Sequence, residues 1–211
     1  MTALPPRSHT PKGRAAREKI LRAAEKLLAA HGFHGTSMRD VADAAGIPLA
    51  SALYHFAKKE QIHAAVLGEI AAELEARLGA ALAREGSYDE RLDALLRALL
   101  AWSADRPGRV RLLVRELLDN PTRVARASRL PLAPVLRTMT AFVEEGIAGR
   151  RLRPVASAET AVLHVVGAVS YAVAARPTVD RIVGEARARA LAAAYPEEAL
   201  ALARRALGAK D

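Results

Sequence analysis

The side chains that could carry out chemistry in this 211-residue chain are few and scattered. The sequence has no cysteine, which excludes disulfides, thiolate metal sites and cysteine nucleophiles. Three of the six histidines, His31, His34 and His63, could approach one another. No Gly-rich phosphate loop, HExxH motif or GxSxG motif is present. We therefore expect no enzyme, no cofactor and no metal site, and binding chemistry is favoured over catalysis.

Basic side chains are concentrated near the N-terminus and indicate a polyanionic partner. Residues 1–60 hold ten Lys or Arg and five Asp or Glu, whereas residues 61–211 hold 22 and 18. A surplus of basic residues that is spread evenly along a chain often serves only solubility. A surplus confined to one region favours a polymer of phosphates such as nucleic acid.

The composition predicts an all-α fold, because Ala and Leu dominate and aromatic residues make up only 4%. The first helix ends at His31 and Gly32, where glycine allows a left-handed turn. Its apolar residues recur with helical spacing: Ile20, Leu21, Ala24, Leu27 and Leu28.

Two short helices are expected to follow. Ser37 and Asp40 are spaced like a capping box that begins the first of them, and Gly46 ends it. Pro48 lies where the next helix begins, a position at which its missing N–H costs nothing, and this helix runs to about Phe56. Two short helices joined by a tight turn and packed against another helix form a helix-turn-helix. The second helix of such a pair must be buried on one face and carry small or polar residues on the other, so that it fits the major groove.

Residues 32–47, from Gly32 to Ile47, match this pattern throughout, and so does the continuation from Tyr54 to Glu60. Together they resemble the N-terminal domain of the tetracycline-repressor (TetR) family of bacterial regulators, over roughly residues 15–62. The resemblance implies phosphate contacts from Ser37, Tyr54 and Lys59. Phosphate contacts set the register on DNA and carry no sequence information.

Base recognition is expected from the exposed face of residues 48–55. Here the chain departs from the family, since many members have Gly, Leu and Tyr where this sequence has Ala50, Ala52 and Leu53. Contacts with thymine methyl groups are plausible, whereas bidentate guanine contacts from this helix are not, because it holds no Arg or Lys. The other residues expected to contact DNA are Lys12, Arg14, Arg39, Pro48, Leu49, Ala50, Ser51, Ala52, His55 and Lys58.

The chain is expected to comprise a flexible basic arm (1–13), a helix-turn-helix DNA-binding domain (14–60) and a larger helical domain (61–211). Further helices are predicted at about 60–85, 88–104, 108–119, 131–148, 156–175 and 179–207, with a break at Pro177. The resemblance implies that this larger domain binds a small-molecule effector and forms a homodimer. The apolar faces of the last two helices either pair with their two-fold mates or are buried within one subunit.

Several residues of the larger domain are candidates to line an effector pocket. Pockets combine apolar walls with a few polar groups. Polar or amphipathic side chains within apolar helical stretches are therefore candidates to line it: Trp102, Arg115, His164 and Tyr171.

A cytoplasmic protein with no membrane contact is expected. No apolar run approaches the ~20 residues that cross a bilayer, and the Pro-rich N-terminus resembles no secretory signal. The expected function is a sequence-specific, ligand-responsive repressor that binds double-stranded DNA at a palindromic operator. The alternatives are a ligand-independent or architectural DNA-binding protein and a protein-interaction scaffold with a degenerate helix-turn-helix.

Overall fold

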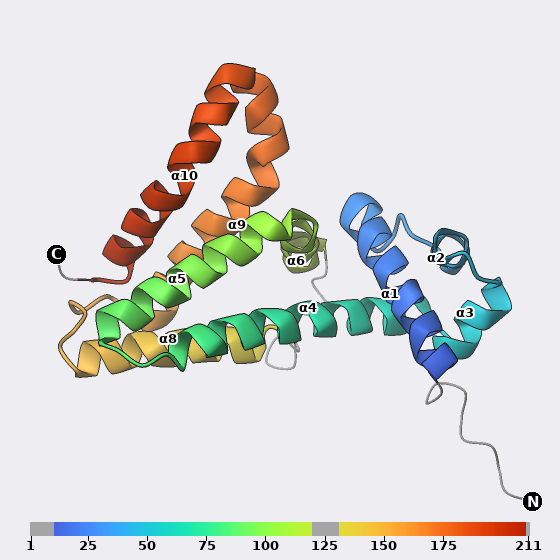
Figure 1. Cartoon of the computed structure of the whole chain (residues 1–211), viewed down its shortest axis with the longest axis horizontal. Coiled ribbons are helices and arrows are strands. Elements are labelled where there is room, and N and C mark those ends of the chain that lie inside the picture. Colours follow the sequence, from blue (N-terminus) through green and yellow to red (C-terminus); the bar gives the residue numbers. More distant parts are fainter. Residues whose placement is uncertain (1–10, 120–130, 210–211) are drawn as a thin grey trace, which may run out of the picture. The chain divides into compact units, whose positions relative to one another are not determined.

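The computed structural model describes residues 11–119 and 131–209, and every helix or strand assigned there is an α-helix (Figure 1). The expected all-α class is therefore confirmed. A single isolated bridge joins Leu152 to Ala209. The chain divides into two compact units, residues 1–70 and residues 71–211. The expected boundary at residue 60 lies close to this division, inside the helix that continues from one unit into the other.

From residue 11 on, the first unit consists of α1 (Pro11–His31), α2 (Met38–Ala45), α3 (Leu49–His55) and the beginning of α4 (Lys59–Leu82). On α1, the predicted apolar face is buried at Ile20, Leu21, Ala24 and Leu28. Gly32 follows with a φ of 72°, the left-handed value predicted for the end of this helix.

The first helix begins earlier than predicted. Residues 11–13 were expected to belong to a flexible arm, but they form the first turn of α1. Pro11 suits this place, because its fixed φ and missing N–H are both tolerated in the first turn of a helix. The rest of the predicted arm, residues 1–10, lies outside the described residues.

The capping box predicted for α2 is present. The Asp40 backbone N–H donates to the Ser37 hydroxyl oxygen at 3.1 Å, and the Ser37 N–H donates to the Asp40 carboxylate at 2.8 Å. Gly46 ends the helix with a φ of 65°. Val41 and Ala42 are buried on its inner face. This local chemistry fixes the start and the end of α2, and so fixes the turn that leads into α3.

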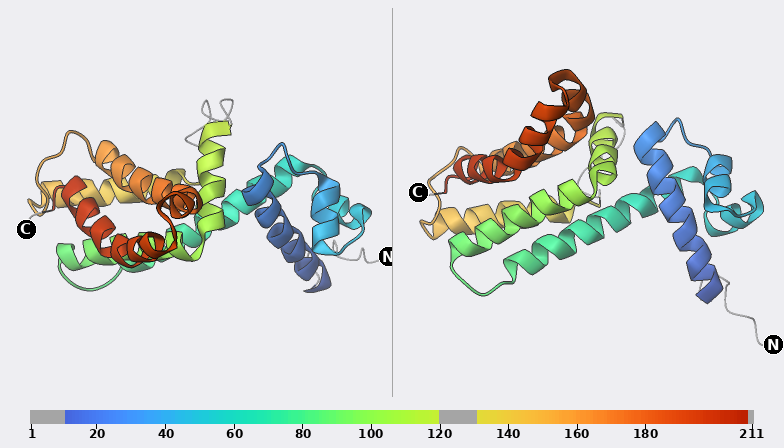
Figure 2. Two further views of the ribbon diagram at one scale, coloured as in Figure 1. Left: turned by 90° about the horizontal axis from the view of Figure 1, so that it is seen from above. Right: turned by 45° about the horizontal axis from the view of Figure 1, so that its top comes forward.

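Within residues 71–119 and 131–209, the second unit contains the remainder of α4 followed by α5 (Tyr88–Asp105), α6 (Pro107–Asp119), α8 (Ala133–Ala148), α9 (Ala158–Val183) and α10 (Glu185–Ala206). In this unit, α9 packs against α5, α6, α8 and α10, and α9 and α10 form an antiparallel pair (Figures 1 and 2). The Tyr88 ring stacks on Phe142 with centroids 4.5 Å apart, and its hydroxyl donates to the Phe142 carbonyl at 2.9 Å. This contact fastens the start of α5 to α8.

The break predicted at Pro177 was wrong. Helix α9 continues through Pro177 to Val183 and ends at Gly184, which has a φ of 80°. An Arg176–Asp180 ion pair spans the proline on the surface of the helix, and Arg176 also donates to the carbonyl of Ala188 on α10 at 2.8 Å. These contacts hold the helix on both sides of the proline and offset the backbone hydrogen bond that the proline removes.

Helix α9 is also longer and more apolar than predicted. By length and composition alone, this one helix of the described chain could cross a membrane. A single such helix is weak support for a membrane span, since core helices of soluble proteins meet the same criteria. Several large apolar side chains of α9 and α10 are exposed: Leu163, Tyr171, Ile182, Leu191 and Leu202. Helices α9 and α10 therefore carry apolar surface that the single chain leaves uncovered.

Candidate nucleic-acid interface and ligand cavity

Helix α3 has one buried face and one exposed face, as a helix that enters the major groove requires. Ala52 is fully buried, and Phe56, one turn later, is also buried. Pro48 and Ala50 are exposed, and Leu49, Ser51 and His55 are half-buried. Leu53 and Tyr54 are 41% and 58% exposed. The exposed face of α3 therefore carries small, apolar and aromatic groups and no positive charge.

Ser37 lies at the N-terminus of α2 and is exposed. Its hydroxyl oxygen accepts the Asp40 backbone N–H, so the Ser37 side chain caps the start of α2. Hydrogen bonding to the Ser37 side chain, and then to the Ser37 backbone N–H, lowers the pKa of the Asp40 carboxyl below its ordinary value. Ser37 thus caps the helix, and its exposed hydroxyl can donate to a phosphate oxygen by turning away from the Asp40 carboxylate.

Lys59 is held by the protein itself. Its ammonium donates to the carbonyls of Phe33 and Thr36 at 2.7 and 2.8 Å, and it lies 4.2 Å from the centre of the Phe33 ring. The Thr36 hydroxyl donates in turn to the Gly32 carbonyl at 2.9 Å. Two of the three N–H groups of Lys59 therefore fasten the loop between α1 and α2 to the start of α4, and one is left for a phosphate.

Four other predicted cations are exposed and are better placed to meet a polyanion. The side chains of Lys12, Arg14, Arg39 and Lys58 make no ion pair or hydrogen bond with the part of the chain that the structure describes. Arg17 differs, since it pairs with Glu69 at 3.5 Å and its guanidinium lies 5.4 Å from the centre of the Phe56 ring. Unpaired cations have no internal partner to give up when they bind phosphate.

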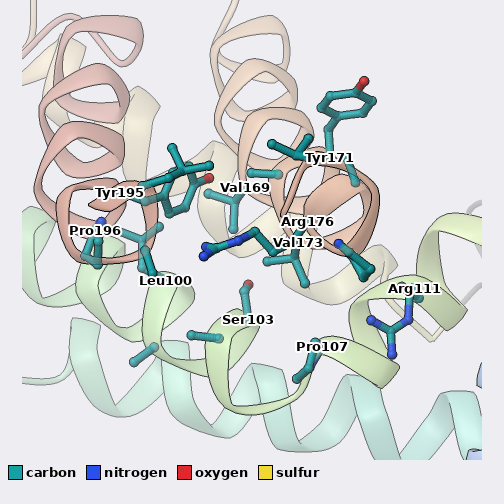
Figure 3. A pocket seen from close by; sticks show the side chains of 18 of the residues that line it. Leu100, Ser103, Pro107, Arg111, Val169, Tyr171, Val173, Arg176, Tyr195 and Pro196 are labelled. Carbon is teal, nitrogen blue, oxygen red and sulfur yellow. The ribbon is translucent and has the colours of Figure 1, made fainter. Parts of the chain in front are cut away.

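The second unit contains a cavity of about 870 Å³ between α5, α6, α9 and α10 (Figure 3). Most of the residues that line it are apolar, among them Leu100, Val169, Val173 and Leu191. The polar or charged residues of the lining are Arg97, Ser103, Arg111, Tyr171, Arg176 and Tyr195. Its volume lies within the ~300–1,000 Å³ of typical small-molecule pockets.

The family matches cover both units. Residues 20–66 match the family described as "Bacterial regulatory proteins, tetR family". Residues 89–199, more than half of the chain, match the "Tetracyclin repressor-like, C-terminal domain". This chain belongs to the TetR family of transcriptional regulators.

Individual members of the TetR family share only part of the chain or a modest sequence identity with it. Over 56 residues the chain is 39% identical to the HTH-type transcriptional regulator RutR of Escherichia coli K12, a match that spans only 26% of each protein. A regulatory protein of the tetR family from Rhodococcus RHA1 has the same fold, with a TM-score of 0.70 and 24% identity over 93% of this chain and 98% of that one. AibR, solved in complex with isovaleryl coenzyme A and operator DNA, has a TM-score of 0.62 and 19% identity over 75% of this chain and 85% of AibR.

Membership of the TetR family confirms that the chain is a DNA-binding regulator and not an enzyme. Among the described residues, no group of three or more His, Cys, Asp or Glu side chains is arranged to hold a metal ion. His63, one of the three histidines that could have approached one another, is instead buried beside the Phe33 ring, with centroids 5.1 Å apart.

One predicted contact of the TetR reading helix was wrong. Ala52 was expected to touch DNA, but it faces the protein and is fully buried. Leu53, which was noted only as a departure from the family pattern, lies instead on the exposed face beside Tyr54. The seven residues of α3 are too few for their periodicity alone to show which side faces the protein.

Of the four residues predicted to line the effector pocket, one lines this cavity and three do not. Tyr171 lies at the rim of the cavity and is 75% exposed. Trp102 is buried, and its neighbours Ala101 and Ser103 line the cavity while Trp102 does not. Arg115 and His164 are exposed and do not line this cavity. No pattern in the sequence indicated that Arg97, Arg111 and Arg176 line one cavity, because they lie on three different helices that only the packing of the second unit brings to it.

Proposed function

We propose that this protein is a ligand-responsive repressor that binds a palindromic operator as a homodimer. The observation that carries the proposal is the exposed face of α3. Its two large side chains, Leu53 and Tyr54, point outward from a helix whose opposite side is anchored by the buried Ala52. The exposed, unpaired cations of the same unit supply the sequence-independent attraction to DNA.

Phosphate and base contacts are divided between the helices of this unit. Ser37 donates its hydroxyl to a phosphate at the positive end of α2, and Arg39 and Lys58 contribute charge. On α3, Ala50 and Leu53 offer apolar contacts to thymine methyl groups, and Ser51 offers a hydroxyl. Ser51→Ala is therefore expected to change the preference among operator sequences, whereas Lys58→Ala weakens all sequences alike.

A homodimer is proposed because one short helix contacts too few base pairs for useful specificity. The uncovered apolar side chains of α9 and α10 support this, since a second copy of the same surface would bury them around a two-fold axis. Two antiparallel helices from each subunit would form a four-helix bundle.

Repression follows if the dimer occupies an operator and blocks transcription. A small molecule bound in the cavity changes the separation of the two reading helices in the dimer, and the dimer then leaves the operator. Such a regulator works where its operator lies, in the cytoplasm.

The direct test is nuclease footprinting of the purified protein on the DNA upstream of its own gene. The titration is run at two salt concentrations, with and without a panel of organic acids, alcohols and amines. The proposal expects a palindromic footprint that one class of compound removes. A footprint that no compound changes would favour the ligand-independent DNA-binding protein, and the absence of salt-dependent DNA binding would favour the scaffold.

A further inference from the structure

The charges that line the cavity are all positive. Three arginines contribute to the lining, and no Asp or Glu does. Two of these arginines are neutralised from outside the lining. Arg97 pairs with Glu197 at 3.0 Å, and Arg176 pairs with Asp180 and also donates to the Ala188 carbonyl. These two ion pairs leave one arginine to set the net charge of the cavity.

That arginine is Arg111 on α6. Its guanidinium makes no ion pair or hydrogen bond with residues 11–119 or 131–209, and its side chain is half-buried. Figure 3 shows Arg111 near Pro107, at the end of the cavity away from Tyr195 and Pro196. A partly buried cation without a partner favours an anionic ligand, since a carboxylate accepts two parallel N–H bonds from a guanidinium.

The rest of the cavity suits an apolar molecule. Between Arg111 and the far end the walls come mainly from apolar side chains, among them Leu100, Val173 and Leu191. The hydroxyl of Ser103 points into this space (Figure 3). The Tyr195 phenol is uncharged near pH 7, and burial raises its pKa further above the ordinary value of 10.0. The lining therefore offers one net positive charge at one end and apolar walls beyond it.

We propose that the effector is an amphipathic carboxylic acid, with its carboxylate on Arg111 and its apolar body along α5, α9 and α10. The inference rests on the proposed function, because it names the ligand class to which the regulator responds. A neutral ligand of the same shape leaves Arg111 unpaired, and a cationic one is repelled by it. The charge of Arg111 therefore sets the order of affinity as acid, then alcohol, then ammonium.

The test measures binding to the full chain by titration calorimetry in the absence of DNA. The probes are decanoate, decan-1-ol and decyltrimethylammonium, which share a ten-carbon chain and differ in the charge of the head group. Wild type is expected to bind decanoate about tenfold more tightly than decan-1-ol, as a charge-assisted bidentate contact predicts. Arg111→Gln removes this preference without changing the affinity for decan-1-ol, whereas Arg111→Lys keeps part of it, because lysine retains the charge and loses the planar fork.

Arg115→Gln is the matched control, since Arg115 is exposed one turn further along α6 and lies outside the cavity. It is expected to keep the full preference for decanoate. The inference is overturned if decan-1-ol binds wild type as tightly as decanoate, if Arg111→Gln keeps the preference, or if none of the three probes binds. Because no DNA is present, these outcomes are independent of the footprinting result. A normal footprint with no bound decanoate rejects the ligand class and leaves the DNA-binding proposal intact.

Discussion

At the scale of single residues, two neighbouring lysines have different structural roles. Lys59 is half-buried and its ammonium bonds two backbone carbonyls, whereas Lys58 is exposed and its side chain has no partner among the described residues. The resemblance to the TetR family predicted a phosphate contact for Lys59. The structure adds that Lys59 fixes the loop from which α2 starts, so this side chain positions the helix-turn-helix, and its contact with DNA remains a prediction.

Replacing these lysines should separate the two roles. Lys59→Ala leaves the Phe33 and Thr36 carbonyls without their charged donor, and we expect it to lower the free energy of unfolding by about 1–3 kcal/mol. Lys58→Ala should leave stability unchanged. It should reduce the slope of the logarithm of the DNA-binding constant against the logarithm of the salt concentration by about one. Urea denaturation measures the first effect, and DNA titrations at several salt concentrations measure the second. Equal stability of the two variants would contradict the positioning role of Lys59.

The Asp40 carboxyl gives a pH-dependent contribution to stability. Because its pKa is lowered in the folded state, its hydrogen bonds stabilise the protein above its ordinary pKa of 3.8, and this stabilisation is lost as the pH falls through the lower folded value. Asp40→Asn should therefore flatten the acid side of the stability curve. Denaturant titrations from pH 7 downward measure this, with Asp43→Asn, an exposed neighbour on the same helix, as the control. If the free energy of unfolding of Asp40→Asn fell with decreasing pH as steeply as that of wild type, the capping box would contribute nothing to the loss of stability in acid.

At the scale of helices, the sequence predicted best where local chemistry decides. The capping box at Ser37, the turn at Gly46 and the start of α4 near residue 60 were all predicted correctly, because each depends on residues within one turn. The predictions failed where packing decides. The continuation of α9 through Pro177 depends on contacts of Arg176, one of them with α10, and the side of α3 that faces the protein depends on the helices behind it. The cavity brings together four helices from residues 97 to 196, and no local pattern reports such an arrangement.

Glycine substitutions test the contact between α5 and α8. A Cβ on Gly146 would lie 2.2 Å from the Tyr88 hydroxyl oxygen and 2.8 Å from Leu152 Cγ, and Tyr88 is held in place by its hydrogen bond to Phe142. Gly146→Ala should therefore lower the free energy of unfolding by about 1–3 kcal/mol through overpacking. Thermal and urea denaturation both measure the effect.

The matched control is Gly79→Ala on α4. A Cβ there meets nothing within 4 Å, so alanine should raise stability by about 0.5–1 kcal/mol through its higher helix propensity. A Gly146→Ala variant as stable as Gly79→Ala would show that Tyr88 can move aside, and that the fastening of α5 to α8 is looser than its geometry implies.

At the scale of the whole molecule, the exposed apolar side chains of α9 and α10 require a covering surface. Leu163 and Ile182 are 67% and 78% exposed, values unusual for large apolar residues of helices rich in Ala, Val and Leu. The proposed homodimer covers them with a second copy of the same helices. Operator binding then depends on this surface, because each half-site alone is bound weakly.

A charge placed on this surface should separate the subunits. Leu163→Glu is expected to shift the protein from dimer to monomer in sedimentation velocity experiments and to weaken operator binding at least about tenfold. Leu136→Glu on α8 is the control, since Leu136 is 45% exposed but belongs to neither α9 nor α10. A Leu163→Glu protein that sediments as a dimer would place the interface elsewhere.

The chain has a single tryptophan, Trp102, and its position makes it an internal optical reporter. The indole is only 2% exposed, and its N–H has no hydrogen-bond partner among the described residues. We therefore expect its emission to be that of an indole in an apolar environment and to shift to longer wavelength when the protein unfolds. Because the flanking residues Ala101 and Ser103 line the cavity, a ligand that displaces α5 also changes this emission. Occupancy of the cavity can then be followed in the native protein without a label.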